Sequence, residues 1–176
     1  MGPVENIDAG QLPSTHRMRR RVLALALGSI WMLPLGCPTD DADDDSQENF
    51  SPCEFEDRSE AYEAGMVHPG TEGLLDVALL GVTPSPPDVG DSEWLVEVTE
   101  PGGGAPISDC SIIATGWMPD HGHGGPEGAS TPAAETGQYT VSGLSFVMSG
   151  YWEITLAVDC LGLEQDQVVF RFCLPG

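Results

Sequence analysis

The residues best suited to chemistry lie in one short stretch, Trp117–Gly125, which reads WMPDHGHGG and is hereafter the His loop. The chain has four histidines, and two of them, His121 and His123, stand here one residue apart, with the thioether of Met118 just upstream. Imidazole and thioether are ligands that soft or borderline metals prefer, copper above all. Pro119 and the glycines disfavour a helix, so this is a loop entered from a strand. The sequence predicts a copper site here, against the alternative of a glycine-rich turn with solvated histidines.

The charge of the chain is strongly negative and unevenly distributed. There are six basic and 28 acidic residues, which give a formal net charge of −22. Four arginines lie between residues 17 and 21, so that after residue 36 only Arg58 and Arg171 stand against 26 acidic residues. A negative field of this strength repels phosphate backbones and excludes nucleic acid as a partner. It also attracts cations without specificity, so geometry rather than charge must identify a metal site.

The N-terminal part has the order of an export signal. Arginines at 19–21 precede an apolar run, Val22–Leu35, which is too short for a comfortable membrane span. The run ends at Pro34-Leu35-Gly36-Cys37, which resembles a bacterial lipobox, with proline where leucine is usual. We expect residues 1–36 to be a signal peptide, with 1–17 a candidate mis-assigned start, and Cys37 to carry a lipid. The alternative is plain secretion, with Cys37 as an ordinary cysteine.

Residues 37–52 form an acidic tether, whose aspartate run is too charged to pack and extends by self-repulsion. Beyond it four cysteines remain, an even number that predicts two disulfides in an exported domain: Cys53, Cys110, Cys160 and Cys173. Because no Cys-x-x-Cys pair occurs, neither a thioredoxin-like centre nor a structural zinc site is expected. These features place the protein in the bacterial cell envelope, held at a membrane by its lipid and either periplasmic or surface-exposed.

Residues 53–176 are predicted to fold as one all-β domain. From Leu74 onward, short apolar or alternating runs are separated by turns rich in proline and glycine. The expected strands are Leu74–Val82, Trp94–Thr99, Cys110–Trp117, Gln138–Val147, Tyr151–Asp159 and Gln167–Cys173. This spacing favours an immunoglobulin-like antiparallel β-sandwich of about seven strands. Before them, Glu54–Met66 could hold a helical turn or two.

Four landmarks of this domain occur in the order of a known family. They are a glycine-rich turn, a Met-Pro pair, a G-x-Y motif and an F-x-M-x-G-x-W motif, at Gly103–Asp109, Met118-Pro119, Gly137-Gln138-Tyr139 and Phe146–Trp152. In these the sequence resembles the YtkA-like domains of bacterial envelope proteins, over roughly Leu74 to Val158. The resemblance implies an immunoglobulin-like fold and permits metal binding. The His121/His123 pair is richer in histidine than the methionine-rich loop associated with that family.

The connection after the His loop decides whether a metal site is geometrically feasible. If the flanking strands formed a simple hairpin, Met118 and Met148 would lie at opposite ends of the sandwich, on the order of 30 Å apart. A connection of about twenty residues is long for a hairpin, so Gly124–Glu135 is expected to return as an irregular extra strand. Both methionines then lie at one end, and His121, His123, Met118 and Met148 form the predicted copper site.

The same layout predicts how the cysteines pair. It places the start of the Cys110 strand beside the end of the Cys160 strand, so these two residues can be bridged. The pair Cys53–Cys173 then ties the N-terminal segment to the last strand.

Motifs of hydrolytic enzymes do not occur in the sequence. It contains neither a Gly-x-Ser-x-Gly elbow nor a His-Glu-x-x-His zinc motif, so no enzyme is expected. Two functions remain. The first is a copper-binding envelope module that buffers the ion or delivers it, with an envelope protein as a candidate partner. The second is a structural or protein-interaction module without a metal, which would tolerate removal of the predicted ligands.

Overall fold

The structure is a computed structural model and describes residues 51–176. The predicted signal peptide, the predicted lipidation site Cys37 and most of the predicted acidic tether lie outside the described residues. Within residues 51–176 no helix is long and apolar enough to cross a membrane. The strands are β1 (Met66–Pro69), β2 (Asp76–Thr83), β3 (Gly90–Thr99), β4 (Cys110–Met118), β5 (His123–Gly124), β6 (Gly128–Pro132), β7 (Gln138–Phe146), β8 (Gly150–Cys160) and β9 (Asp166–Leu174).

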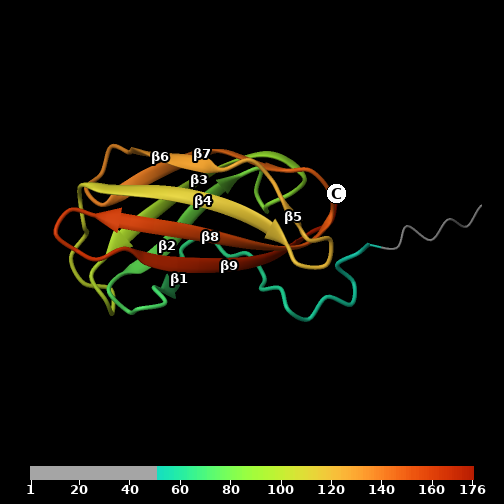
Figure 1. Cartoon of the computed structure of the whole chain (residues 1–176), viewed down its shortest axis with the longest axis horizontal. Helices are drawn as coiled ribbons and strands as arrows, with labels where there is room; N and C mark the ends of the chain where they lie inside the picture. Colours follow the sequence, from blue (N-terminus) through green and yellow to red (C-terminus); the bar gives the residue numbers. More distant parts are fainter. Residues whose placement is uncertain (1–50) are drawn as a thin grey trace, which may run out of the picture. The chain divides into compact units, whose positions relative to one another are not determined.

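The strands pair antiparallel in the order β1-β2-β3-β7-β6-β4-β8-β9, with β5 paired to the end of β4. The sheet curls over one core, and Figure 1 shows β4, β8 and β9 crossing β2 and β3. This is the predicted all-β antiparallel architecture, compatible with an immunoglobulin-like sandwich but with nine strands. The predicted count of about seven missed β1 and β5, because four and two residues are too few to show a periodicity.

The core is built by the period-two alternation that the sequence predicted. In β4, for example, Ile112 and Ala114 point inward and are fully buried, while Ile113 between them is exposed. The largest fully buried side chains include Trp94, Trp152 and Phe146. Burial of aromatic area on this scale supplies much of the apolar surface that drives folding.

The connection from β5 to β7 returns across the domain, as predicted. Strand β6 pairs with β4 at Ala114↔Gly128 and with β7 at Ser130↔Val141, so it lies between them. As a result β4 and β7 run in the same direction and end together. This end of the sandwich, hereafter the site end, carries the His loop and Met148.

The segment before β1 differs from the prediction. Glu54–Met66 contains turns and no helix, and its last residue begins β1. A disulfide, Cys53–Cys173, ties the start of this segment to β9 near the site end. The second disulfide, Cys110–Cys160, joins directly opposed residues of β4 and β8 at the other end, hereafter the far end. Both disulfides have the predicted pairing.

Candidate functional site

The His loop is a tight reversal of the chain at the end of β4. The backbone N–H groups of His121 and Gly122 both donate to the Met118 carbonyl, at 3.3 and 2.9 Å. Gly122 has φ +66°, a left-handed conformation that glycine adopts without steric cost. The chain then runs back as β5, with His123 opposite Met118 and Gly124 opposite Trp117. A Cβ at residue 124 would lie 2.5 Å from the Gly116 carbonyl oxygen, so glycine is needed there for close packing.

The register of β4 and β5 decides where the imidazoles lie. Directly opposed residues of antiparallel strands point to the same face, so His123 shares the face of Met118. The His123 ring stands edge-on to Trp152, with 6.3 Å between ring centroids, and is half-buried. The His121 ring is exposed, and its centroid lies 5.8 Å from that of His123. In the described part of the chain no side-chain hydrogen bond engages either imidazole, so their nitrogens are free to bind a ligand.

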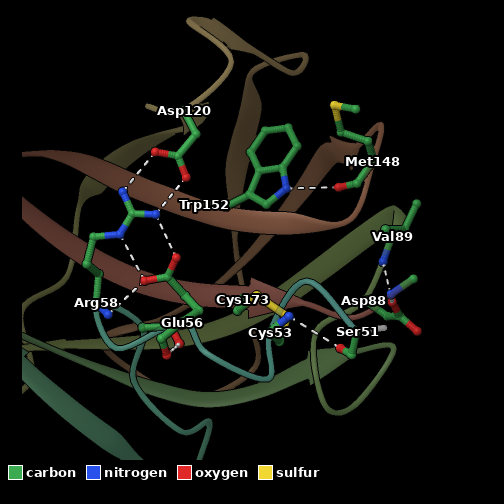
Figure 2. The surroundings of a disulfide bond; sticks show 12 residues. Ser51, Cys53, Glu56, Arg58, Asp88, Val89, Asp120, Met148, Trp152 and Cys173 are labelled. Atoms are coloured by element: carbon green, nitrogen blue, oxygen red, sulfur yellow. Dashed lines mark hydrogen bonds and ion pairs between the residues drawn. A yellow bond between two sulfur atoms is a disulfide. The ribbon is translucent and has the colours of Figure 1, made fainter. Parts of the chain in front are cut away.

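The two methionines differ in accessibility. Met118 is 1% exposed, and its methyl group packs against Gly150, where an added Cβ would approach it to 2.9 Å. Met148 is 36% exposed, and its carbonyl accepts a hydrogen bond of 3.0 Å from Trp152 Nε1 (Figure 2). The structure thus brings all four predicted ligand residues to the site end, one of them inside the core.

Aromatic residues of the F-x-M-x-G-x-W motif form the floor beneath the His loop. Phe146 and Trp152 meet with ring centroids 5.2 Å apart and an interplanar angle of 67°. Gly116 leaves room for them, because a Cβ there would lie 3.2 Å from Phe146 and 3.3 Å from Trp152. The G-x-Y motif acts at the far end, where the Tyr139 hydroxyl donates to Ile107 O and accepts from Cys110 N, both at 3.0 Å. Both motifs therefore have a structural role whether or not a metal binds.

A cluster of charged residues flanks the His loop, and Arg58 is its centre. Its guanidinium donates two hydrogen bonds to the Asp120 carboxylate, at 2.9 and 2.6 Å, and two to Glu56 (Figure 2). It also lies over the Tyr151 ring, 4.1 Å from the centroid. These hydrogen bonds hold the pKa of Glu56 and of Asp120 below their ordinary values and raise that of Arg58. Burial, with a hydrogen bond to Glu153, raises the pKa of Tyr151.

His68, the third histidine within residues 51–176, lies outside the site. Its Nδ1 donates to the Val169 carbonyl at 3.0 Å, its Nε2 lies 2.8 Å from Glu60 Oε2, and its ring stacks on Phe170 at 4.6 Å. Both nitrogens are engaged, so His68 serves packing between β1 and β9 and does not belong to the site.

The donor set of the site end can be tested against copper. Among residues 51–176 no group of three or more His, Cys, Asp or Glu side chains could hold an ion. The predicted ligand set instead combines two imidazoles with two thioethers. Two imidazoles that share one ion at roughly 2.0–2.1 Å keep their ring centroids within about 6.5 Å of each other. The observed 5.8 Å meets that limit. Two imidazoles with nearby thioethers suit copper, whereas hard cations prefer oxygen ligands.

Comparison with known proteins assigns the domain. The structure defines an all-β sandwich with two disulfides, a combination typical of domains that fold in oxidising compartments. Residues 75–157 match the family model described as YtkA-like, which confirms the resemblance seen in the sequence. Comparison with curated proteins finds no match.

Two solved structures are similar to part of this chain. One is a copper-bound variant of FetP from uropathogenic Escherichia coli, with a TM-score of 0.45, 16% identity and coverage of 65% of this chain and 97% of that chain. The other is "as isolated" FetP from the same bacterium, with a TM-score of 0.43, 15% identity and coverage of 63% and 97%. Similarity this remote says nothing of a ligand in this chain.

Sequence reasoning missed the residues that surround the predicted ligands. Arg58 lies over the Tyr151 ring and contacts the His loop through Asp120. Arg58 and Asp120 are 62 residues apart in the sequence. One signal was available: after residue 36 only two basic residues occur, and a lone arginine in so acidic a chain must find a carboxylate. Which carboxylate it would be depended on the path of residues 53–60.

Proposed function

We propose that the site end binds one copper ion through His121 and His123, with Met118 and Met148 as thioether ligands for Cu(I). In this role the protein is a non-catalytic module of the cell envelope that buffers the ion or hands it to another protein. The observation that carries the proposal is the register of β4 and β5. It puts His123 on the same face as Met118, while the His121 ring lies 5.8 Å from the His123 ring.

The accessibility of the donors supports exchange of the ion rather than permanent storage. His121 and Met148 are exposed, so an ion can arrive and leave through them without unfolding of the sandwich. Met118 lies beneath, against Gly150, so its thioether reaches the ion only after a side-chain rearrangement. Methionine is flexible enough for such a movement. Copper, when bound, would bring its preference for soft ligands and its redox chemistry to the site.

A lipid at Cys37 would keep this module at a membrane, near envelope proteins that take up or use copper. The support is the order of basic, apolar and small residues before Cys37. Membrane fractionation of cells that express the full chain and Cys37→Ser tests this part. We expect the full chain with the membranes and Cys37→Ser in the soluble fraction. An unmodified N-terminus at any other residue in mass spectra would contradict it.

A Cu(I) competition assay against a chromogenic chelator, on the full chain, tests the metal site. His121→Ala/His123→Ala removes two direct ligands, so we expect Cu(I) affinity to fall by more than about 100-fold, beyond the usual cost of losing an outer contact. The matched control, Asp91→Asn/Glu93→Gln, removes two carboxylates from the exposed face of β3 and should leave the affinity unchanged.

Equal binding by the wild type and the histidine variant would contradict the proposal. Copper would then be held only by the acidic surface, and the YtkA-like domain would be a structural or interaction module. The roles of the aromatic floor and of the G-x-Y motif would not change, because both act within the fold.

A further inference from the structure

The segment that holds the His loop lies outside the YtkA-like domain. The family match begins at residue 75, whereas the contact to Asp120 comes from Arg58. Figure 1 shows the chain between residue 51 and β1 running along the site end, beside the ends of β5 and β9. This segment therefore lies outside the residues that the family model matches.

The backbone is anchored to β9 on both sides of Arg58. On one side of it the Cys53–Cys173 disulfide fixes the segment to β9. On the other side the Glu60 N–H donates to the Arg171 carbonyl at 2.8 Å, and the Arg171 N–H donates to Glu60 Oε1 at 2.7 Å. Between these anchors the guanidinium is oriented by Glu56 and by the face of Tyr151. Its Nη1 and Nη2 atoms then donate one hydrogen bond each to the Asp120 carboxylate (Figure 2).

The His loop has few other restraints. The N–H groups of His121 and Gly122 share one acceptor, the Met118 carbonyl. Within residues 51–176, the only side chain that hydrogen-bonds any residue from Pro119 to Gly122 is that of Arg58, through Asp120. Asp120 directly precedes His121, so restraint of its carboxylate restricts the backbone that carries the first imidazole.

We propose that Arg58 is a positioning residue for the His loop. Through its bidentate hydrogen bonds to the Asp120 carboxylate, it holds the His121 ring beside the His123 ring. The effect on copper rests on the proposed function. The planar guanidinium fork fits a carboxylate in one orientation, which a lysine ammonium does not reproduce. If the imidazoles are already held near the separation they have when an ion is bound, less entropy is lost when the ion binds, and the affinity is higher. The charges of Glu56, Arg58 and Asp120 sum to a negative value, so the cluster as a whole does not repel the cation.

The test uses the metal-free and the copper-loaded full chain, with Arg58→Ala, Arg58→Lys and the control Arg171→Ala. Arg171 pairs with Glu153, at 3.6 Å, so its replacement removes the same charge without touching the His loop. In the metal-free chain, amide hydrogen exchange at His121 and Gly122 should rise about tenfold in Arg58→Ala, as expected when a local restraint is lost. It should rise less in Arg58→Lys, and not at all in Arg171→Ala.

With copper, the Cu(I) affinity of Arg58→Ala should fall by about 10-fold or more, the usual cost of removing a contact that orients a ligand. Arg58→Lys should recover part of that loss. Unchanged amide exchange in Arg58→Ala, or an equal change in Arg171→Ala, would overturn the positioning role. If no chain binds Cu(I) specifically while the exchange results hold, the copper function fails and Arg58 still positions the loop.

Discussion

The two ends of the sandwich each hold a loop through an aspartate, but by different means. At the far end, Asp166 is 1% exposed and accepts backbone N–H groups of Glu72, Leu74 and Gln167 at 2.8–2.9 Å. At the site end, Asp120 is exposed and is held by the Arg58 side chain. Buried backbone hydrogen bonds are hard to exchange for water, whereas an exposed ion pair contributes little to stability.

The difference suggests that the far-end loop at Asp166 is permanent structure, whereas the His loop at Asp120 is adjustable. A Cβ at Gly70 would overlap the Asp166 carboxylate, so the far-end loop fits its aspartate closely and has no room to move. Between Pro119 and Gly122, within the part of the chain described, the only side chain that hydrogen-bonds the His loop is that of Arg58, through Asp120. Segments that bind and release ligands are drawn from such regions of low local stability. The following predictions test this contrast, from the largest expected effect to the smallest.

Loss of a disulfide should have the largest effect on stability, and the two ends should differ in what else changes. Replacement of either cysteine pair by serine should lower the free energy of unfolding by about 2–5 kcal/mol in denaturant titrations. Only Cys53→Ser/Cys173→Ser should also speed amide exchange at Gly122, because it frees the segment that carries Arg58. Faster exchange there in Cys110→Ser/Cys160→Ser would show that the two ends are not independent.

Asp166→Asn should destabilise the protein by about 1–3 kcal/mol, since an amide nitrogen then faces backbone donors that need an acceptor. Burial alone would raise the pKa of Asp166, but N–H donors from Glu72, Leu74, Gln167 and Leu75 hold it below the ordinary value. A depressed folded-state pKa means that the carboxylate stabilises the fold above its unfolded pKa of about 3.9, and that this stability is lost as pH falls through the folded value.

Denaturant titrations from about pH 5 down to the acid transition check this prediction. Stability that comes from a carboxylate of depressed pKa is usually lost between about pH 5 and pH 1. The stability of Asp166→Asn should depend less on pH than that of the wild type. Equal pH dependence would mean that other carboxylates account for the acid sensitivity. Copper binding at the site end should not change, because Asp166 belongs to the far end.

Met118→Leu should have the smallest effect on stability, below about 1.5 kcal/mol, because leucine nearly conserves the volume of this buried side chain. Met148→Leu, at an exposed position, should change stability even less. Together the two substitutions should weaken Cu(I) more than Cu(II), since thioethers favour the reduced ion. Paired affinity measurements for the two oxidation states decide this. Equal losses for both would remove the methionines from the proposed site.

The sequence predicted the parts of the fold that rest on local pattern and chain length. Strand alternation located β4 to within one residue, and the long connection after the His loop correctly required a return strand, β6. Both disulfides followed from that layout. The expected helical turns in Glu54–Met66 were wrong, because contacts to β9 rather than local periodicity determine the path of that segment.

The candidate site was less accessible to sequence reasoning. The meeting of Met148 with the His loop at one end follows from strand direction. Burial of Met118 and exposure of Met148 depend instead on how Gly150 and Trp152 pack. The contact of Arg58 with Asp120 depends on a segment without regular structure, fixed by a disulfide. Both features depend on tertiary contacts, so no local sequence pattern predicts them. Metal binding remains a prediction at all four positions.

The N-terminal segment and β1 have one more consequence, for association between molecules. Strand β9 is at the end of the strand order, where unpaired carbonyls could template a strand from another chain. The outer carbonyls of Gln167, Val169 and Arg171 instead accept hydrogen bonds from Thr71 N, His68 Nδ1 and Glu60 N. Irregular backbone and one imidazole thus cap this edge without extending the sheet. The segment that carries Arg58, together with β1 and the residues just after it, therefore also protects the domain against edge-to-edge aggregation.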